Sequence, residues 1–311
     1  MVIDLEDNNN KNDDFRAGYV AIIGAPNVGK STLLNALLGQ KLSIVSDKPQ
    51  TTRHKILGIY TRDNLQIIFL DTPGLLKPKY LLHEAMMKSA EAAIHDADAV
   101  LLIVDGTTTP KSITSGEDIG LNHLIAVKKP VILAINKIDI LGREKAFESA
   151  AAYSQKFQFD EIYPISAKNS TGLRELTEGL SRLLPHHPPF YPADIMSELP
   201  EKFFVAEIIR EKIFEKFREE IPYSTTVDII EFKEKKGRKD VIRAEIYLER
   251  DSQKGILIGK KGQALKEIGE LARKDIESFL ERPVFLELHV KVRSNWREKK
   301  EWLKRLGYGE K

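Results

Sequence analysis

The chain has 311 residues, 42% of them hydrophobic, which allows one or two domains with a sizeable core. It contains no cysteine, which excludes disulfides, iron–sulfur clusters and thiolate zinc sites. The formal net charge of +2 gives no global argument for a nucleic-acid partner, and no apolar run reaches the roughly 20 residues that cross a membrane.

Residues 1–14 are polar and rich in Asn and Asp, which predicts a disordered leader. An apolar run at 19–23 then predicts a strand, and the run 32–38 predicts a helix. Between the two lies a glycine-rich loop, and Thr32 follows it as the first residue of the predicted helix. The loop residues are Gly24, Ala25, Pro26, Asn27, Val28, Gly29, Lys30 and Ser31. In this position the loop can turn its N–H groups toward a phosphate, Lys30 can reach the terminal phosphates, and Ser31 can hold Mg²⁺. The segment therefore predicts a P-loop for a nucleoside triphosphate.

Two apolar runs, 57–60 and 65–68, follow a polar stretch and are separated by only four residues, which predicts an antiparallel hairpin. The second run continues to residue 70 and ends in Asp71, Thr72, Pro73 and Gly74. A carboxylate at the end of a strand lies where α/β folds bind ligands, so Asp71 can hold Mg²⁺ through water. The N–H group of Gly74 is available to a γ-phosphate.

A further buried run, 130–135, leads into Asn136, Lys137, Ile138 and Asp139. The Asp139 carboxylate can accept hydrogen bonds from both N1–H and the 2-amino group of guanine. Adenine lacks that pair of donors, and a site of this kind can reject the wrong ligand by on the order of 10⁴. Together with the P-loop and Asp71, this spacing predicts a guanine nucleotide, GTP or GDP.

From residue 19 to 184 the strand and helix patterns alternate, which predicts a mostly parallel sheet covered by helices. The proline-rich stretch 185–192 predicts a linker. Beyond it, the patterns predict a helix over 201–220 that stops at Ile221-Pro222, strands at 226–232 and 241–248, a helix to about 279, and a strand at 284–290. With one more helix before residue 259, the order is α-β-β-α-α-β.

A second glycine-containing loop lies in this half, formed by Ile258, Gly259, Lys260, Lys261 and Gly262. Its glycines let a sugar–phosphate chain approach, its lysines supply charge, and a helix starting near Gln263 offers its N-terminus to a phosphate. Residues 291–311 are a second basic candidate for RNA contact, with eight basic and three acidic residues.

The first half resembles a translation-factor-class GTPase of the Ras-like fold, and the second half resembles a type II KH domain. Their combination is similar to the Era family of bacterial ribosome-assembly GTPases. The resemblance implies an α/β Ras-like P-loop GTPase domain at 15–185, whose mostly parallel sheet has one antiparallel edge strand. A linker at 186–200 and an α+β KH domain with a basic tail at 201–311 follow.

The family resemblance also implies a function. It implies GTP binding and slow hydrolysis to GDP, with Ser166 and Ala167 supporting the base through backbone amides. It implies binding near the 3′ end of small-subunit ribosomal RNA, on a precursor of the small subunit. We further expect a monomer in the cytoplasm, with some contact to the cytoplasmic face of the inner membrane, and an apolar KH groove that holds about four unstacked nucleotides.

Residues 50–54 resemble the first switch segment of such GTPases. Thr52, which we favour over Thr51, would bind Mg²⁺ and the γ-phosphate, so the predicted metal ligands are Ser31, Thr52 and Asp71. Leu75 stands where many Ras-like GTPases place a glutamine that orients water, which predicts slow hydrolysis. Asn27 is a candidate to hold K⁺ against the phosphates, although a turn asparagine is the alternative. The candidate catalytic residues are therefore Asn27, Lys30, Thr52 and Gly74.

Two other functions fit parts of the pattern. A GTPase that serves RNA modification would need a modification domain or a catalytic cysteine, and neither is present. A P-loop kinase would lack the guanine site at 136–139.

Overall fold

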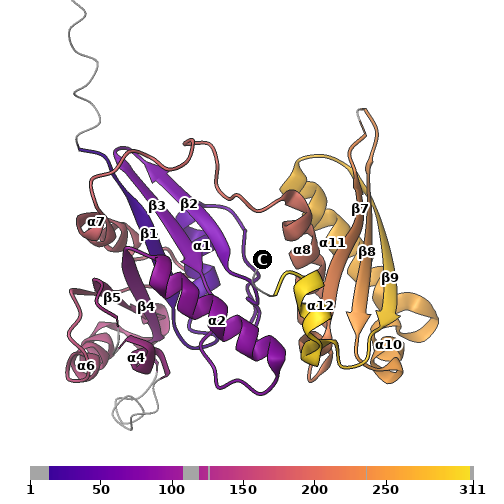
Figure 1. The fold of residues 1–311 in the computed structure, drawn as a ribbon, viewed down its shortest axis with the longest axis horizontal. Coiled ribbons are helices and arrows are strands. Elements are labelled where there is room, and N and C mark those ends of the chain that lie inside the picture. The colour runs from indigo at the N-terminus through magenta and orange to yellow at the C-terminus, as the bar shows by residue number, and fades with distance from the viewer. Residues whose placement is uncertain (1–13, 108–118, 125–126, 236, 309–311) are drawn as a thin grey trace, which may run out of the picture. The chain divides into compact units, whose positions relative to one another are not determined.

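The computed structural model describes residues 14–107, 119–124, 127–235 and 237–308, so all but Asp14 of the predicted leader lies outside the described residues. The chain divides into two compact units (Figure 1). The first comprises Met1–Lys41, Lys55–Leu75 and Ser89–Glu198, and the second comprises Leu42–His54, Leu76–Lys88 and Leu199–Lys311. Two short segments from the first half of the chain therefore group with the C-terminal residues.

The first unit is built on a six-stranded sheet of order β2-β3-β1-β4-β5-β6. Only β2 runs antiparallel, paired with β3 from Ile56 to Arg62, which confirms the predicted hairpin and the single antiparallel edge strand. Strands β4 and β5 are buried along almost their whole length, as expected for parallel strands covered on both faces. The strands are β1 Arg16–Ile23, β2 Ile56–Arg62, β3 Leu65–Asp71, β4 Ala99–Asp105, β5 Val131–Asn136 and β6 Glu161–Pro164.

The described helices of the first half follow the predicted alternation with the strands. They are α1 Lys30–Leu38, α2 Leu81–Asp96, α4 Ile119–Leu124, α5 Ile138–Leu141, α6 Arg143–Ser154 and α7 Leu173–Leu183. Because β1, β3, β4 and β5 are mutually parallel, their carboxyl ends meet at one edge of the sheet. This edge carries the glycine-rich loop, Asp71, Asp105 and Asn136.

The proline-rich stretch is fastened to the first unit. The buried Gln66 amide accepts from the N–H groups of Phe190 and Tyr191, at 2.7 and 3.0 Å, and donates to the Tyr191 carbonyl at 2.8 Å. Further along, the Met196 carbonyl accepts from the Ile59 N–H of strand β2 at 2.8 Å. Phe190, Tyr191 and Met196 are therefore held to strands β2 and β3 of the first unit by hydrogen bonds.

The second unit carries a three-stranded sheet of order β7-β8-β9, with β7 antiparallel to β8 and β8 parallel to β9. Its core joins one face of this sheet to α8, α10 and α11, with Ile242, Ile246 and Ile268 fully buried. The predicted order α-β-β-α-α-β is confirmed. The elements are α8 Glu201–Lys216, α9 Ile221–Ser224, β7 Thr226–Lys233, β8 Asp240–Leu248, α10 Asp251–Ile258, η1 Lys260–Gly262, α11 Gln263–Leu280, β9 Val284–Val292, η2 Trp296–Glu298 and α12 Lys300–Arg305.

The predicted end of the first helix of this unit is wrong. Helix α8 ends at Lys216, and Phe217 is extended. Pro222 then lies in the first turn of the short helix α9. A proline lacks the N–H that the first turn leaves without an intrahelical partner, so Ile221-Pro222 begins a helix instead of stopping one.

No helix among the described residues is long and apolar enough to span a membrane.

Candidate nucleotide and RNA sites

The glycine-rich loop after β1 depends on glycine at two positions. Gly24 has φ 149° and Gly29 has φ 103°. A Cβ on Gly24 would lie 2.2 Å from the Ile103 carbonyl oxygen, and one on Gly29 would lie 2.2 Å from Nδ2 of Asn136. Both glycines are therefore fixed by backbone angle and by their neighbours. Gly29 is the N-cap of α1, so the loop ends at a helix N-terminus, as a phosphate site requires.

Lys30 lies buried within this loop. Its ammonium group donates to the carbonyls of Gly24, at 3.1 Å, and Ala25, at 2.9 Å. Burial lowers the pKa of Lys30 to about 8, against an opposing effect of the nearby Asp71 carboxylate. A lysine held in this way can meet a phosphate without first being ordered.

The residues present fit Mg²⁺ bound together with a nucleotide. The Ser31 hydroxyl donates to Oδ2 of Asp71 at 3.1 Å, and both side chains are buried. A hydroxyl and a carboxylate are oxygen ligands of the kind that Mg²⁺ prefers. No group of three or more His, Asp or Glu residues suited to a metal occurs in the described part of the chain. Mg²⁺ with few protein ligands is typical of sites where substrate phosphates supply the others.

Gly74 and Leu75 pack against the P-loop. A Cβ on Gly74 would lie 2.9 Å from the Pro26 backbone, and the Leu75 N–H donates to the Gly24 carbonyl at 3.0 Å. The Leu75 side chain is fully buried and apolar, so it cannot orient water. The contact of Gly74 with a γ-phosphate stays a prediction.

Asn136 joins the predicted base site to the P-loop. Its Nδ2 donates to the Val28 carbonyl at 2.8 Å, and its Oδ1 accepts from the Ala167 N–H at 2.9 Å. The Ser166 hydroxyl donates to Oδ1 of Asp139 at 2.7 Å. The structure thus brings together four of the predicted base-site residues, and the Asp139 side chain is exposed to an incoming ligand.

Asn27 is exposed and has φ 63°, a left-handed conformation that asparagine tolerates better than most residues. The backbone alone therefore explains an asparagine here. Its role in holding K⁺ stays a prediction.

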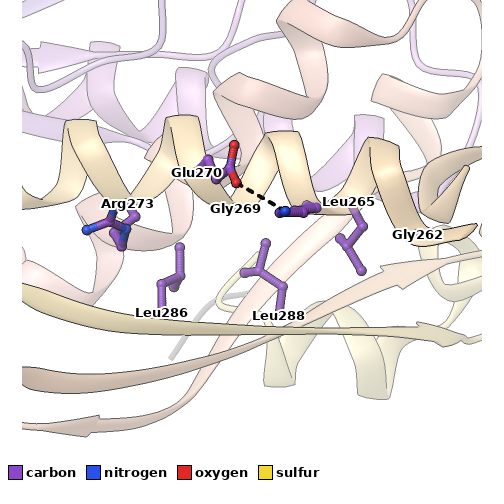
Figure 2. Close-up of a pocket in the computed structure, with 8 residues that line it drawn as sticks. Gly262, Leu265, Gly269, Glu270, Arg273, Leu286 and Leu288 are labelled. Atoms are coloured by element: carbon purple, nitrogen blue, oxygen red, sulfur yellow. Dashed lines mark ion pairs between the residues drawn. The ribbon is translucent and has the colours of Figure 1, made fainter.

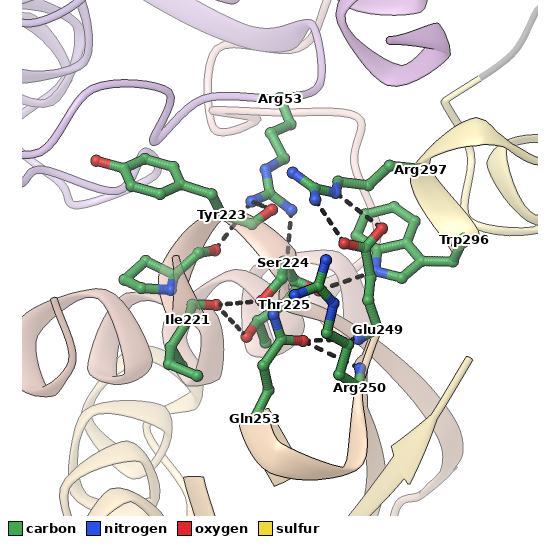
Figure 3. A network of polar contacts seen from close by, with 11 residues as sticks. Arg53, Ile221, Tyr223, Ser224, Thr225, Glu249, Arg250, Gln253, Trp296 and Arg297 are labelled. Atoms are coloured by element: carbon green, nitrogen blue, oxygen red, sulfur yellow. Dashed lines mark hydrogen bonds and ion pairs between the residues drawn. The ribbon is translucent and has the colours of Figure 1, made fainter. Parts of the chain in front are cut away.

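The predicted first switch segment belongs to the second unit, and Thr52 is buried there. Its neighbour Arg53 donates to the carbonyls of Pro222, Tyr223 and Thr225, at 3.0, 3.0 and 2.7 Å (Figure 3). The carbonyl of Thr51 accepts from Arg210, another buried side chain. The metal role of Thr52 stays a prediction, whereas the anchoring roles of Arg53 and Arg210 were not anticipated from the sequence.

The second glycine-containing loop joins α10 to α11. Gly259 has φ 72° and ψ 178°, and Gly262 has φ 77° and ψ 8°, both on the positive side that favours glycine. Lys260 and Lys261 between them are exposed. Gly262 is the N-cap of α11, whose 18 residues give the loop a helix N-terminus.

A groove runs from this loop between α11 and β9 (Figure 2). Its volume is about 390 Å³, and Gly262, Leu265, Lys266, Gly269, Glu270, Arg273, Leu286 and Leu288 line it. Leucines form its apolar wall, and Gly269 opposes Leu288 without a side chain of its own. The sequence predicted an apolar groove but not its residues, although Leu265, Gly269 and Arg273 recur at the four-residue spacing of one helix face.

Comparisons with known proteins identify the family of each half of the chain. A family model described as 50S ribosome-binding GTPase matches residues 19–137, and a KH-domain model matches residues 220–297. GTPase Era of Geotalea daltonii is 46% identical over 294 residues, which cover 94% of this chain and 98% of that protein. The chain belongs to the Era family of GTPases.

Other Era-family members support this assignment. An Era-like chloroplastic GTPase of Arabidopsis thaliana is 46% identical over 299 residues, covering 96% of this chain and 70% of that protein. A crystal structure of an Aquifex aeolicus Era variant bound to GDP and AlF₄⁻ aligns with a TM-score of 0.91 and 43% identity, over 95% of this chain and all of that one. The Ras-like GTPase domain followed by a KH domain, inferred from the sequence, is therefore confirmed, and so is GTPase activity.

Proposed function

We propose that this Era-family GTPase is a GTP-dependent switch that binds small-subunit ribosomal RNA near its 3′ end and acts in small-subunit assembly and rRNA maturation. One observation carries most of this proposal. An Era crystal structure, described as a complex with MgGDPNP and nucleotides 1506–1542 of 16S ribosomal RNA, is 42% identical to this chain. It covers 95% of this chain and all of its own, with a TM-score of 0.88.

In this proposal the GTPase domain spans 15–185, the linker 186–200 and the KH domain 201–311. The P-loop residues 24–32 and residues 71–74 bind the phosphates, and Ser31 and Asp71 hold Mg²⁺. Thr52 adds a ligand in the GTP-bound state. Mg²⁺ would supply neutralisation of the phosphate charge, while Lys30 would fix the terminal phosphates.

Hydrolysis is proposed to be slow because the Leu75 side chain is apolar and buried. Asn27 would hold K⁺ beside the phosphates and so add a second positive charge to that of Lys30. We expect faster turnover in KCl than in NaCl at equal ionic strength, and no such difference in Asn27→Ala. Equal rates for the parent protein in the two salts would remove K⁺ from the mechanism.

RNA binding is assigned to residues 258–262 and the adjoining groove. The loop offers two exposed lysines and a helix N-terminus to phosphates, and the leucine-lined groove accommodates unstacked bases. The alternative basic segment is partly engaged elsewhere, because Arg297 pairs with Glu249 at 2.5 Å (Figure 3). The Arg297 guanidinium also lies over the Tyr80 ring. The proposed place of action is the cytoplasm, as a monomer with contact to the inner-membrane face; this part rests on family resemblance.

The base site is tested with Asp139→Asn. We expect GTP to bind about 100-fold more weakly and xanthosine triphosphate to bind better, because the asparagine amide offers a donor where guanine also offers one. Both nucleotides are titrated against parent and variant. An unchanged preference for GTP would exclude residues 136–139 as the base site.

The RNA partner is tested by crosslinking in cells, followed by sequencing of the bound RNA. The matched control carries Lys260→Gln and Lys261→Gln, which remove both charges, and keeps the whole GTPase domain. Enrichment of the 3′ end of 16S RNA with the parent, and a severalfold lower enrichment with the control, is the expected result. Enrichment of a modified RNA site elsewhere would favour the alternative function in RNA modification.

A further inference from the structure

Asp105 ends strand β4, beside the base site but outside every motif that the sequence singles out. Its Oδ2 accepts from the Lys137 ammonium group at 2.7 Å. Its Oδ1 accepts from the Thr107 N–H at 2.9 Å and from the Thr107 hydroxyl at 2.6 Å. Both carboxylate oxygens are therefore engaged, and the carboxylate is held in one orientation while it holds Lys137.

The electrostatics agree with this geometry. Burial alone would raise the pKa of the Asp105 carboxyl, but the hydrogen bonds from Lys137 and Thr107 outweigh it and hold the pKa below its usual value. The pair is partly shielded, with 23% of the Asp105 side chain and 31% of the Lys137 side chain exposed. Such a charge-assisted bond is stronger than a fully exposed surface pair.

The ion pair is not needed to align the two strands. Asp105 lies opposite Asn136 in the parallel ladder of β4 and β5, and the Gly106 N–H extends that ladder to the Asn136 carbonyl at 2.9 Å. Lys137 itself has φ 69°, a conformation that glycine or asparagine adopts with less strain. Because lysine is strained in this backbone conformation, we infer that its side chain has a role that offsets the strain.

We propose that Asp105 is a positioning residue for nucleotide binding: by holding the Lys137 ammonium group, it fixes the methylene stem of Lys137 as one wall of the base site. This inference rests on the proposed base site at 136–139. Lysine stems commonly cover flat apolar surfaces while their charged ends are held elsewhere. Ordering the stem in advance removes an entropic cost that the nucleotide would otherwise have to offset.

The test is a double-mutant cycle on equilibrium binding of GTP and inosine triphosphate, which lacks the 2-amino group. Asp105→Asn should weaken both nucleotides by the same factor, about threefold to tenfold, which is the cost of ordering one long side chain. Lys137→Met should weaken both as well. Asp105→Asn should have no further effect in the Lys137→Met background, because the ammonium group on which it acts is gone.

Controls separate this role from a purely structural one. Asp105→Glu, which keeps the charge, should restore most of the affinity, and Glu148→Gln on the exposed face of α6 should change nothing. The inference is overturned if the Asp105→Asn protein binds both nucleotides as tightly as the parent does. It is also overturned if Asp105→Asn lowers nucleotide affinity by the same factor in the parent and in the Lys137→Met background. If Asp105→Asn also lowers the melting temperature of the nucleotide-free protein, the nucleotide affinity of Asp105→Glu decides between a positioning and a structural role. A loss of affinity in Asp105→Glu as large as that in Asp105→Asn contradicts the proposal.

Asp139→Asn is measured in parallel. If it leaves the preference for GTP over inosine triphosphate intact, the base-site assignment fails. If that preference falls while the cycle shows no coupling between positions 105 and 137, only the role of Asp105 fails.

Discussion

The P-loop and the KH loop of this chain share a plan but differ in burial. Each has glycines at positive φ on both sides of its turn, Gly24 and Gly29 in one and Gly259 and Gly262 in the other. Each carries lysine and leads into a helix, α1 or α11. Both can therefore present backbone N–H groups and a cation to phosphate oxygens.

The neighbours of the two loops differ. A Cβ on Gly29 would collide with Asn136, whereas a Cβ on Gly262 meets no atom within 4 Å. Lys30 is 6% exposed and bonded to its own loop, whereas Lys260 and Lys261 are exposed. A buried, tightly determined loop suits one compact ligand of fixed size. An open loop lets a polymer enter and leave on either side, with a weaker interaction at each phosphate.

The largest expected effect is that of Lys30→Met, which keeps the length of the side chain and removes its charge. GTP affinity should fall by at least about 100-fold, because the variant cannot donate a buried, charge-assisted hydrogen bond to the phosphates. RNA affinity, measured for both proteins without nucleotide, should stay within about twofold. Competition titration with a fluorescent nucleotide and a filter-binding assay with RNA measure the two. Comparable losses of both would show that the loops are not independent.

Lys30 should also give the nucleotide-free protein a distinct pH dependence. Its pKa is lowered from 10.5 to about 8 by burial. Above pH 8 the folded protein loses a proton that the unfolded chain keeps up to pH 10.5, so stability rises with pH in that window. Between pH 8 and 9.5, the free energy of unfolding of the parent should gain about 2 kcal/mol relative to Lys30→Met. Urea titrations of both proteins measure it, and a constant difference would contradict the burial of a charged Lys30.

Gly262 permits a sharper test of the KH loop than Gly259, where a Cβ would lie 2.6 Å from that of Ala264. Gly262→Asp and Gly262→Asn have nearly the same shape, and both residues tolerate the left-handed conformation. The aspartate should weaken single-stranded RNA binding by at least about tenfold more than the asparagine, because only it repels phosphate. Equal affinities of the two variants would place the RNA backbone elsewhere.

The smallest effect is expected from Lys260→Gln combined with Lys261→Gln. RNA affinity should fall by about fivefold at low salt, since exposed lysines contribute modestly. The slope of log affinity against log salt should become shallower by about 0.7 for each phosphate that a lysine no longer neutralises. An unchanged slope would mean that neither lysine binds phosphate, and the basic residues from Lys291 onward would become the leading candidate.

Local patterns in the sequence predicted much of the fold. Apolar runs in the first half and alternating apolar residues in the second located the strands, and the four-residue gap between 60 and 65 predicted the β2–β3 hairpin correctly. The loop glycines and the residues that follow strands predicted the candidate site, because turn geometry and strand ends are local properties.

Contacts between distant residues were beyond such patterns. Gln66 fastens Tyr191, which lies 125 residues away, and Arg53 bonds carbonyls some 170 residues away. Neither residue differs in local context from an ordinary strand or loop residue. Asp105 likewise ends a strand as many aspartates do, and only the folded chain brings it to Lys137. The sequence did not predict that α8 ends at Lys216, because Phe217, where the backbone becomes extended, is neither a proline nor a glycine.

The two hydrogen bonds of the Asn136 side chain, one to the P-loop and one to the predicted base site, limit how such a protein can evolve or be redesigned. Asn136 ties the P-loop carbonyl of Val28 to the N–H of Ala167 and fills the space that a side chain at position 29 would need. Substitutions at these positions must therefore change together or not at all. Asp139, by contrast, is bonded through its Oδ1 only to Ser166 among the polar contacts of the described base site. Under the proposed assignment of Asp139 to the base, nucleobase choice is a separable property: a designer could alter it at one carboxylate while leaving the phosphate-binding residues unchanged.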